Sequence, residues 1–215
     1  MNDRTTTTAT RGSRRGRPRA GEREERRHRV IEAAFDELLE HGYDGVTMLG
    51  IARRAGASKE TLYSWFGSKP GLFEAVIRDN ADASAQQVHA ALAGDGDPQA
   101  TLTGYAIGLL SLLTSERSVA LNRASMTSPD LAAILLESGR HRVGPIVEEY
   151  LARLADEGHL ATDDPAAAFS LLYGLVVQDT QIRVLLGERP PSKAAIARRA
   201  DEAVMRFLDL VGARE

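Results

Sequence analysis

Apolar positions recur at helical spacing along most of the chain, and glycine, proline or a capping residue stands at the breaks. Ile31, Phe35, Leu38 and Leu39 fall on one face of a helix that we expect over 22–41. No stretch alternates between apolar and polar residues over more than a few positions, so the pattern predicts no strand. We therefore expect an all-α protein.

Two short helices joined by a tight turn are predicted over 48–55 and 59–66. Thr47 and Ser58 can cap them, because a hydroxyl there accepts a free backbone N–H of the first turn. Gly56 stands where the chain leaves the first helix, and we expect it to adopt a positive φ. The outer face of the second helix carries Lys59, Glu60, Thr61, Tyr63, Ser64 and Trp65. A short helix with such a face suits insertion into the major groove of DNA.

Longer helices follow the two short ones. One is expected to begin at Lys69, with Pro70 in its first turn, where proline is tolerated, and to end at Gly94. A run of glycine, aspartate and proline over 94–98 then marks a clear break. Further helices are predicted over 98–114, 118–126, 129–157, 165–186 and 192–211.

The segment from Ala52 to Lys69 reads A-x-x-A-G-x-S-x-x-T-L-Y-x-x-F-x-S-K. These many fixed residues at fixed spacing, with Thr47 and Leu72 beside them, resemble the tetracycline-repressor-like (TetR) family of regulators. The resemblance covers about 29–77. Trp65 is a departure, since many members carry His or another polar residue there, and it leaves the operator sequence open. Two segments, Y-S-W-F-G-S-K and Y-G-L-V-V-Q-D-T-Q-I-R-V-L-L-G, are similar to the AefR-like subgroup.

The resemblance implies a sequence-specific DNA-binding transcriptional regulator, a repressor that a small-molecule ligand releases. It implies a three-helix helix-turn-helix DNA-binding domain over 22–77 and a helical ligand-binding and dimerisation domain over 78–215. The implied partners are a double-stranded DNA operator, a second copy of the chain in a homodimer, and an effector that the sequence does not identify. An architectural or partner-recruiting DNA-binding adaptor without an effector remains the alternative, which a filled C-terminal core would favour.

Several residues are candidates for DNA contact. Tyr63 and Lys69 match family positions that hold phosphates, and Lys69 lies at a helix N-terminus, where free N–H groups also face an anion. Lys59 and Thr61 are candidates for base edges, because lysine can donate to guanine and a threonine methyl can meet a thymine methyl. The structural alternatives are that Thr61 only stabilises the turn and that Tyr63 lies partly in the core. Further candidates are Thr47 for a phosphate and Ser58, Ser64 and Trp65 in support.

The first 21 residues are polar and basic, and they carry too few apolar side chains to fold alone. A disordered tail is the simplest interpretation. As a basic arm, the segment would add phosphate contacts or enter the minor groove. The arginines that would do so are Arg11, Arg14, Arg15, Arg17 and Arg19.

Charge and composition narrow the function further. Basic residues outnumber acidic ones by 14 to 10 through Pro70, and acidic residues outnumber basic ones by 20 to 13 beyond it, which fits a DNA-binding domain joined to one that avoids DNA. The absence of cysteine excludes disulfides and thiol redox sensing. No metal-ligand spacing, nucleophile elbow or phosphate loop is present, so no metal, cofactor or enzyme activity is expected. The longest apolar stretch, 166–177, is too short to span a bilayer, and we expect a cytoplasmic protein without a membrane partner.

The C-terminal half sets a few polar residues inside apolar runs, which is typical of a small-molecule site. The alternative for each single residue is a core or surface position with a satisfied hydrogen-bond partner. The candidates are Tyr105, Asn122, Arg123, Met126, Tyr173, Gln178 and Gln181. The last two predicted helices should pack partly on their own core and partly on a second chain, and a monomer with all of these residues in its core is the alternative. The dimer candidates are Leu172, Val176, Val204, Phe207, Leu208 and Val211.

Overall fold

The computed structural model describes residues 20–94 and 96–213. The candidate arginines of the basic arm lie outside the described residues; they are Arg11, Arg14, Arg15, Arg17 and Arg19. The described residues form eleven α-helices and no strand, which confirms the all-α prediction. One isolated antiparallel bridge pairs Leu160 with Gly212. Within the described ranges, no helix is both long enough and apolar enough to cross a membrane.

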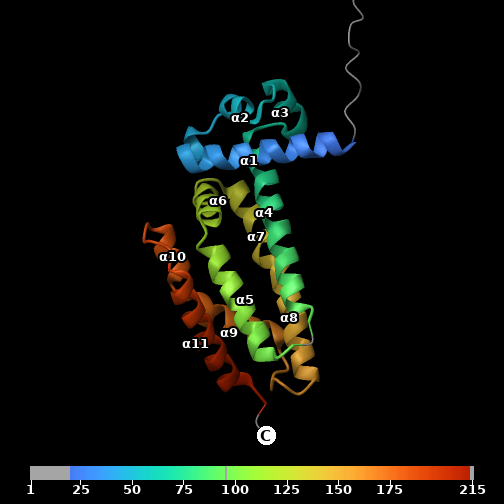
Figure 1. The fold of residues 1–215 in the computed structure, drawn as a ribbon, viewed down its shortest axis with the longest axis vertical. Helices are drawn as coiled ribbons and strands as arrows, with labels where there is room; N and C mark the ends of the chain where they lie inside the picture. The colour runs from blue at the N-terminus through green and yellow to red at the C-terminus, as the bar shows by residue number, and fades with distance from the viewer. Residues whose placement is uncertain (1–19, 95, 214–215) are drawn as a thin grey trace, which may run out of the picture.

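The first three helices form the unit at one end of the molecule. They are α1 (Ala20–Gly45), α2 (Met48–Ala55) and α3 (Lys59–Phe66), and the bounds of the two short helices are those predicted. Figure 1 shows α2 and α3 lying across α1. The first helix continues past its predicted end at residue 41, with a kink at Gly42, where φ is 65°.

The remaining helices build the elongated second part. They are α4 (Lys69–Leu92), α5 (Pro98–Leu113), α6 (Glu116–Met126), α7 (Pro129–Ser138), α8 (Arg140–Asp156), α9 (Pro165–Val177), α10 (Thr180–Leu185) and α11 (Lys193–Val211). In Figure 1, α4 begins beneath the first unit and runs down the length of the second part. This long helix therefore links the first unit to the second part.

Two predicted helices are each interrupted. The helix predicted over 129–157 is in fact α7 and α8, because the chain breaks at Gly139 with φ −91° and ψ −99°. A Cβ on Gly139 would lie 2.8 Å from the carbonyl oxygen of Leu135, so a glycine is needed for this close approach. The helix predicted over 165–186 ends at Val177, because Gln178 adopts φ 44°, and α10 follows.

Two clusters of buried side chains form the core. One is made mainly by α5, α8, α9 and α11, with Leu151, Leu172 and Phe207 at its centre. The other lies beneath the short helices and includes Ile51, Leu62 and Phe73. This second cluster also takes side chains from α6 and α7, so the first unit is packed directly on the second part across the boundary expected at 77/78.

Candidate nucleic-acid interface and internal cavity

The turn between α2 and α3 is fixed by the caps that the sequence predicts. The Thr47 hydroxyl accepts a hydrogen bond from the Gly50 N–H at 3.0 Å, and the Ser58 hydroxyl accepts one from the Thr61 N–H at 3.1 Å. Gly56 adopts φ 62° and ψ 34°, the left-handed conformation that glycine favours. These local interactions set the angle at which α3 leaves α2.

Leu62 anchors α3 because its side chain is fully buried in the core beneath the helix, so the opposite face of α3 points to solvent. Lys59 and Ser64 are exposed, and Tyr63 retains 44% of its accessible surface. The Lys59 ammonium lies 5.6 Å from the centre of the Tyr63 ring. This face presents a cation, a phenol and a hydroxyl to solvent, together with the exposed carboxylate of Glu60.

Two other candidates on α3 are partly engaged in the fold. Thr61 is half-buried, and its hydroxyl lies 3.0 Å from the Ser58 hydroxyl within the cap. Trp65 is also half-buried and packs edge-to-face with Phe66, with ring centres 6.3 Å apart. Their expected DNA contacts remain predictions, and both side chains also contribute to local structure.

Lys69 is the first residue of α4 and lies at the edge of the same surface. Its ammonium donates to the backbone carbonyl of Tyr43 and lies 4.5 Å from the centre of the Tyr43 ring. Partial burial lowers the pKa of the Lys69 ammonium. The Ser68 hydroxyl caps α4 by accepting from the Gly71 N–H at 3.2 Å. The positive charge is therefore fixed beside the N-terminus of a helix, which is the geometry that suits a phosphate.

An ion-pair network that the sequence analysis missed locks α2 onto α1. Arg54 Nε donates to Glu37 at 2.8 Å, and the same guanidinium also binds Glu40 and lies 3.8 Å from Asp36. The hydrogen bond from Arg54 lowers the pKa of the Glu40 carboxyl. Exposed Arg53 beside it has no such partner among the described residues and adds an unforeseen candidate for phosphate contact.

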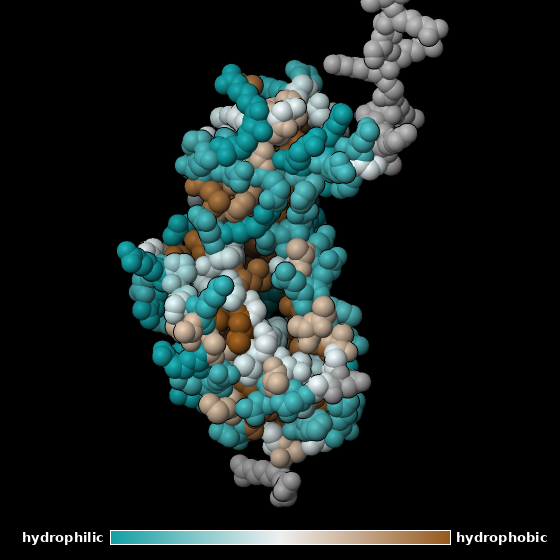
Figure 2. All heavy atoms as spheres, in the orientation of Figure 1, coloured by the Kyte–Doolittle hydropathy of each residue, from teal (hydrophilic) through white to brown (hydrophobic). Residues whose placement is uncertain are grey.

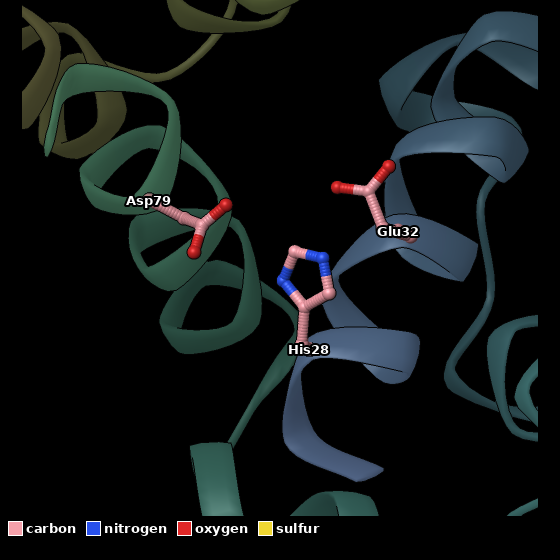
Figure 3. Close-up of side chains that lie close together, drawn as sticks. All are labelled: His28, Glu32 and Asp79. Carbon is pink, nitrogen blue, oxygen red and sulfur yellow. The ribbon is translucent and has the colours of Figure 1, made fainter. Parts of the chain in front are cut away.

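A second polar cluster lies where the first unit meets α4. His28 and Glu32 on α1 face Asp79 on α4, and their ligand atoms lie within 4.8 Å of one another (Figure 3). Arg117 of α6 donates to both Glu32 oxygens, at 2.9 and 3.1 Å. The hydrogen bond from Arg117 lowers the pKa of Glu32. This guanidinium already pairs with Glu32, and the polar residues here join α1, α4 and α6.

A cavity of about 300 Å³ lies among α4 to α10. Figure 2 shows a hollow near the middle of the molecule with apolar side chains at its rim. Of the predicted ligand-binding residues, Tyr105, Asn122 and Tyr173 line it, as does Gln181. Burial raises the pKa of the Tyr105 phenol, which therefore stays protonated at neutral pH.

Three predicted ligand-binding residues lie outside this cavity. Arg123 instead donates to the backbone carbonyls of Leu185 and Val184, at 3.1 and 3.3 Å, and so holds α10 against α6. Met126 is 64% exposed, and Gln178 is exposed at the end of α9. A polar residue within an apolar run can thus serve a helix contact or a helix end, and the pattern alone does not distinguish these roles.

The cavity wall includes residues that the sequence analysis missed. Arg140, at the start of α8, places its guanidinium 4.5 Å from the centre of the Tyr173 ring and 5.2 Å from that of Phe169. Gly104 and Gly108, one turn apart on α5, also line the cavity. Glycines inside a helix are the sequence signal that could have directed attention here.

Four of the predicted dimer residues are in the wrong place for that role. Each is fully buried in the protomer's own core, where no second chain can reach it; they are Leu172, Val176, Val204 and Phe207. The other two, Leu208 and Val211, are half-buried against the same core. The large exposed apolar side chains of α10, its C-cap residue and α11 are instead Ile182, Leu186, Met205 and Leu210.

Comparison with known proteins gives matches to both parts of the chain. Residues 30–76 match the family described as bacterial regulatory proteins of the tetR family. Residues 100–212 match the family described as the C-terminal domain of AefR-like transcriptional repressors. The second match alone spans more than half of the chain.

Individual relatives agree with these matches. An uncharacterized HTH-type transcriptional regulator of Bacillus subtilis, YdeS, is 36% identical over 110 residues. The match covers 51% of this chain and 51% of YdeS, so the chain spans about half the length of that relative. The HTH-type transcriptional regulator BetI of Escherichia coli is 30% identical over 147 residues, which cover 65% of this chain and 75% of BetI. A crystal structure described as a TetR-family regulator from Mesorhizobium loti is 28% identical and superposes with a TM-score of 0.82, over 88% of this chain and 98% of that one.

Proposed function

The chain belongs to the TetR family of transcriptional regulators, and we propose that it represses transcription as a homodimer until a small molecule enters its cavity. Members of this family are regulators rather than enzymes. In the proposed mechanism, α3 of each protomer enters the major groove at one half of a two-fold symmetric operator. The ligand then favours a conformation in which the two α3 helices no longer match the half-sites.

The outer face of α3 supports the DNA-binding part of this proposal. Lys59, Tyr63 and Ser64 project from a helix whose buried side is anchored by Leu62. Lys69, fixed at the N-terminus of α4, is placed to hold a phosphate of the same half-site. Contacts of these two kinds would give sequence selectivity and general affinity respectively.

The observation that carries the ligand-responsive part is the position of Ile77. This α4 side chain belongs to the buried core beneath α3 and also lines the cavity. Further along α4, Ala81 and Ser84 line the same cavity. A ligand that presses on this wall would therefore act on the helix that supports the DNA-reading unit.

The cavity also separates this proposal from its alternative. A DNA-binding adaptor without an effector has no need of an internal space, whereas a cavity of about 300 Å³ is within the usual size range of small-molecule sites. Coupling between ligand and operator in such systems is typically about 1–3 kcal/mol, or roughly 5- to 150-fold in affinity. We expect an effect of this size on operator binding.

Dimerisation is proposed from the exposed apolar side chains of α10 and α11 and from the geometry of DNA reading. These two helices lie along one side of the second part (Figure 1). One short helix contacts too few base pairs for useful specificity, so two copies are needed. We place the interface on Ile182, Leu186, Met205 and Leu210.

Selection of bound sequences from random duplex DNA by the purified full chain tests the proposal. We expect enrichment of a two-fold symmetric site with half-sites about one helical turn apart or a multiple of it. Enrichment of no sequence, with only salt-sensitive general binding, would contradict a sequence-specific repressor. The recovered site then supplies the probe for release by ligands.

A further inference from the structure

The break between α7 and α8 forms a polar corner in the cavity wall. Ser138, Gly139 and Arg140 all line the cavity at this point. Ser138 is only 5% exposed, and its hydroxyl has no hydrogen-bond partner among the described residues. A buried hydroxyl without a partner is unfavourable, and an acceptor on a bound ligand would satisfy it.

Arg140 supplies a positive charge beside this hydroxyl. Its guanidinium is held against the rings of Tyr173 and Phe169 and forms no ion pair with a described carboxylate. By contrast, Arg142 on the same helix pairs with Asp82 of α4. No aspartate, glutamate or lysine lines the cavity, so Arg140 is its one charged residue within the described chain. Stacking restrains the guanidinium plane and leaves its edge for a planar anion.

The start of α8 adds to the same preference. This 17-residue helix begins after Gly139 without a side-chain cap, whereas Ser128 caps α7 and Asp164 caps α9. The N-terminus of a helix attracts negative charge through its dipole and its free N–H groups. The hydroxyl, the guanidinium and the helix end thus meet at one corner, and all three favour an anion.

The α5 side of the cavity is flat. Gly104 and Gly108 lie one turn apart, and a Cβ built on either meets no other atom within 4 Å. Neither glycine is therefore required by packing, and a glycine inside a helix is less favourable than alanine. Two such glycines on a cavity wall leave room for a ligand to lie directly against the helix backbone.

The cavity volume sets the size of that ligand. A cavity of about 300 Å³ is roughly twice the ~150 Å³ cavity that holds one benzene ring in a protein interior. We propose that this cavity binds a carboxylate with a flat apolar body of two rings. The carboxylate meets Arg140 and Ser138, and the rings lie along Gly104 and Gly108. This inference rests on the proposed effector function and names its chemical class.

Isothermal titration of the full chain with three probes tests the class directly. The probes are biphenyl-4-carboxylate, the neutral biphenyl-4-carboxamide and the flexible chain of decanoate. We expect the aromatic carboxylate to bind roughly tenfold to a hundredfold more tightly than the amide, because a hydrogen-bonded charge is lost in the amide. Equal affinity of the acid and the amide, or no binding of the acid, would overturn the proposal.

Substitutions locate the anion corner. Arg140→Gln should remove the preference for the acid over the amide, whereas Arg142→Gln, two residues away and outside the cavity wall, should retain it. Because both arginines are exposed, neither change is expected to impair folding. Loss of the preference in both variants, or in neither, would contradict the assignment to Arg140.

A third variant tests the flat wall. Gly104→Ala should raise the melting temperature of the free protein, because alanine favours the helix. The same substitution should weaken the binding of biphenyl-4-carboxylate more than the binding of decanoate. If Gly104 had only a structural role, the substitution would leave the ratio of the two affinities unchanged. Tighter binding of decanoate than of the biaryl acid in the unsubstituted protein would overturn the flat-body assignment.

Operator selection distinguishes a failure of this inference from a failure of the proposed function. Selection of bound DNA needs no ligand, so recovery of a symmetric site without binding of the acid would sink the inference and leave DNA recognition standing. Binding of the acid without release of that site would support the ligand class and contradict ligand-controlled repression.

Discussion

Lys69 donates a hydrogen bond to the backbone carbonyl of Tyr43, and this contact joins the first residue of α4 to the last turns of α1. It fixes the ammonium next to the capped N-terminus of α4. The lysine therefore reaches the DNA-facing edge as an ordered charge, whose conformational entropy is largely lost before any DNA is bound.

Lys69→Ala should weaken binding to the selected operator and to random DNA by similar factors. The lost interaction is with a phosphate, which carries no sequence information. The slope of log K against log[salt] should become shallower by about one. Titration by fluorescence anisotropy at several salt concentrations measures both quantities. An unchanged slope would show that Lys69 serves only the contact with Tyr43.

Lys59→Ala should change sequence preference instead. Lys59 is exposed on the outer face of α3, where its ammonium can reach a base edge. We expect a loss of about 1–3 kcal/mol on the preferred sequence and relaxed selection at one position of each half-site. Repeating the selection with the variant measures this. Equal losses on operator and random DNA would assign Lys59 to the phosphates.

Gly71→Ala and Gly104→Ala should shift stability in opposite directions. A Cβ on Gly71 would overlap the carbonyl oxygen of Phe66, whereas one on Gly104 meets no atom within 4 Å. We expect Gly71→Ala to lower the free energy of unfolding by about 1–3 kcal/mol. Gly104→Ala should raise it by up to about 1 kcal/mol. Urea denaturation of the two variants measures both changes in the free energy of unfolding. A lower stability of Gly104→Ala would mean that other atoms already occupy the space beside Gly104.

The ion pair between Glu32 and Arg117 should give the protein a specific pH dependence. The hydrogen bond from Arg117 lowers the pKa of Glu32, so the pair stabilises the folded state above the ordinary glutamate pKa. This contribution is lost as the pH falls through the lowered pKa. After solvent screening, Glu32→Gln should cost about 0.5–1 kcal/mol at neutral pH.

The difference in unfolding free energy between the unsubstituted protein and Glu32→Gln should therefore shrink below about pH 4, near the ordinary glutamate pKa. Glu74→Gln is the control, because Glu74 pairs with Arg78 one turn away on the surface of α4 and joins no other element. A constant difference for Glu32→Gln from neutral to acidic pH would exclude the ion pair as its cause.

Leu210→Glu should separate the proposed dimer. Leu210 is 64% exposed on α11, so a charge there leaves the protomer's core intact but opposes an apolar interface. Leu39→Glu, on α1, serves as a control for an exposed apolar position in the first unit. Light scattering at micromolar concentration should give a dimer for the unsubstituted protein and the control. A mass near 23.3 kDa for the unsubstituted protein would refute the dimer.

Local sequence signals predicted the DNA-facing unit in detail. Thr47, Ser58 and Ser68 cap their helices through hydrogen bonds over three residues, so a short window of sequence contains both partners. Gly56 adopts the expected left-handed conformation for the same reason. The bounds of α2 and α3 were therefore predictable without knowledge of the rest of the fold.

The second part depends on contacts that are distant in sequence. The break at Gly139 follows from a close approach to Leu135, and helical periodicity continues on both sides of it. Apolar spacing also cannot tell a face that packs on its own core from one that packs on a partner, so Leu172 and Phe207 were assigned to the wrong surface. The cavity itself is an absence of atoms. Polar residues within apolar runs indicated part of its wall, namely Tyr105, Asn122, Tyr173 and Gln181, whereas Arg140 and the two glycines were missed.

The ion pairs of Arg54 have a consequence for how regulation evolves. Since they bind α2 to α1, and only the short turn through Gly56 and the capping residue Ser58 separates α3 from α2, we expect the three helices to move as one rigid head. The ligand would then change the spacing of the two heads along the double helix, and the bases that each head contacts would stay the same. Substitutions that retune the inducer and substitutions that retarget the regulator to new promoters should accordingly fall in separate regions of the chain and combine freely. The two properties could thus diverge independently after gene duplication.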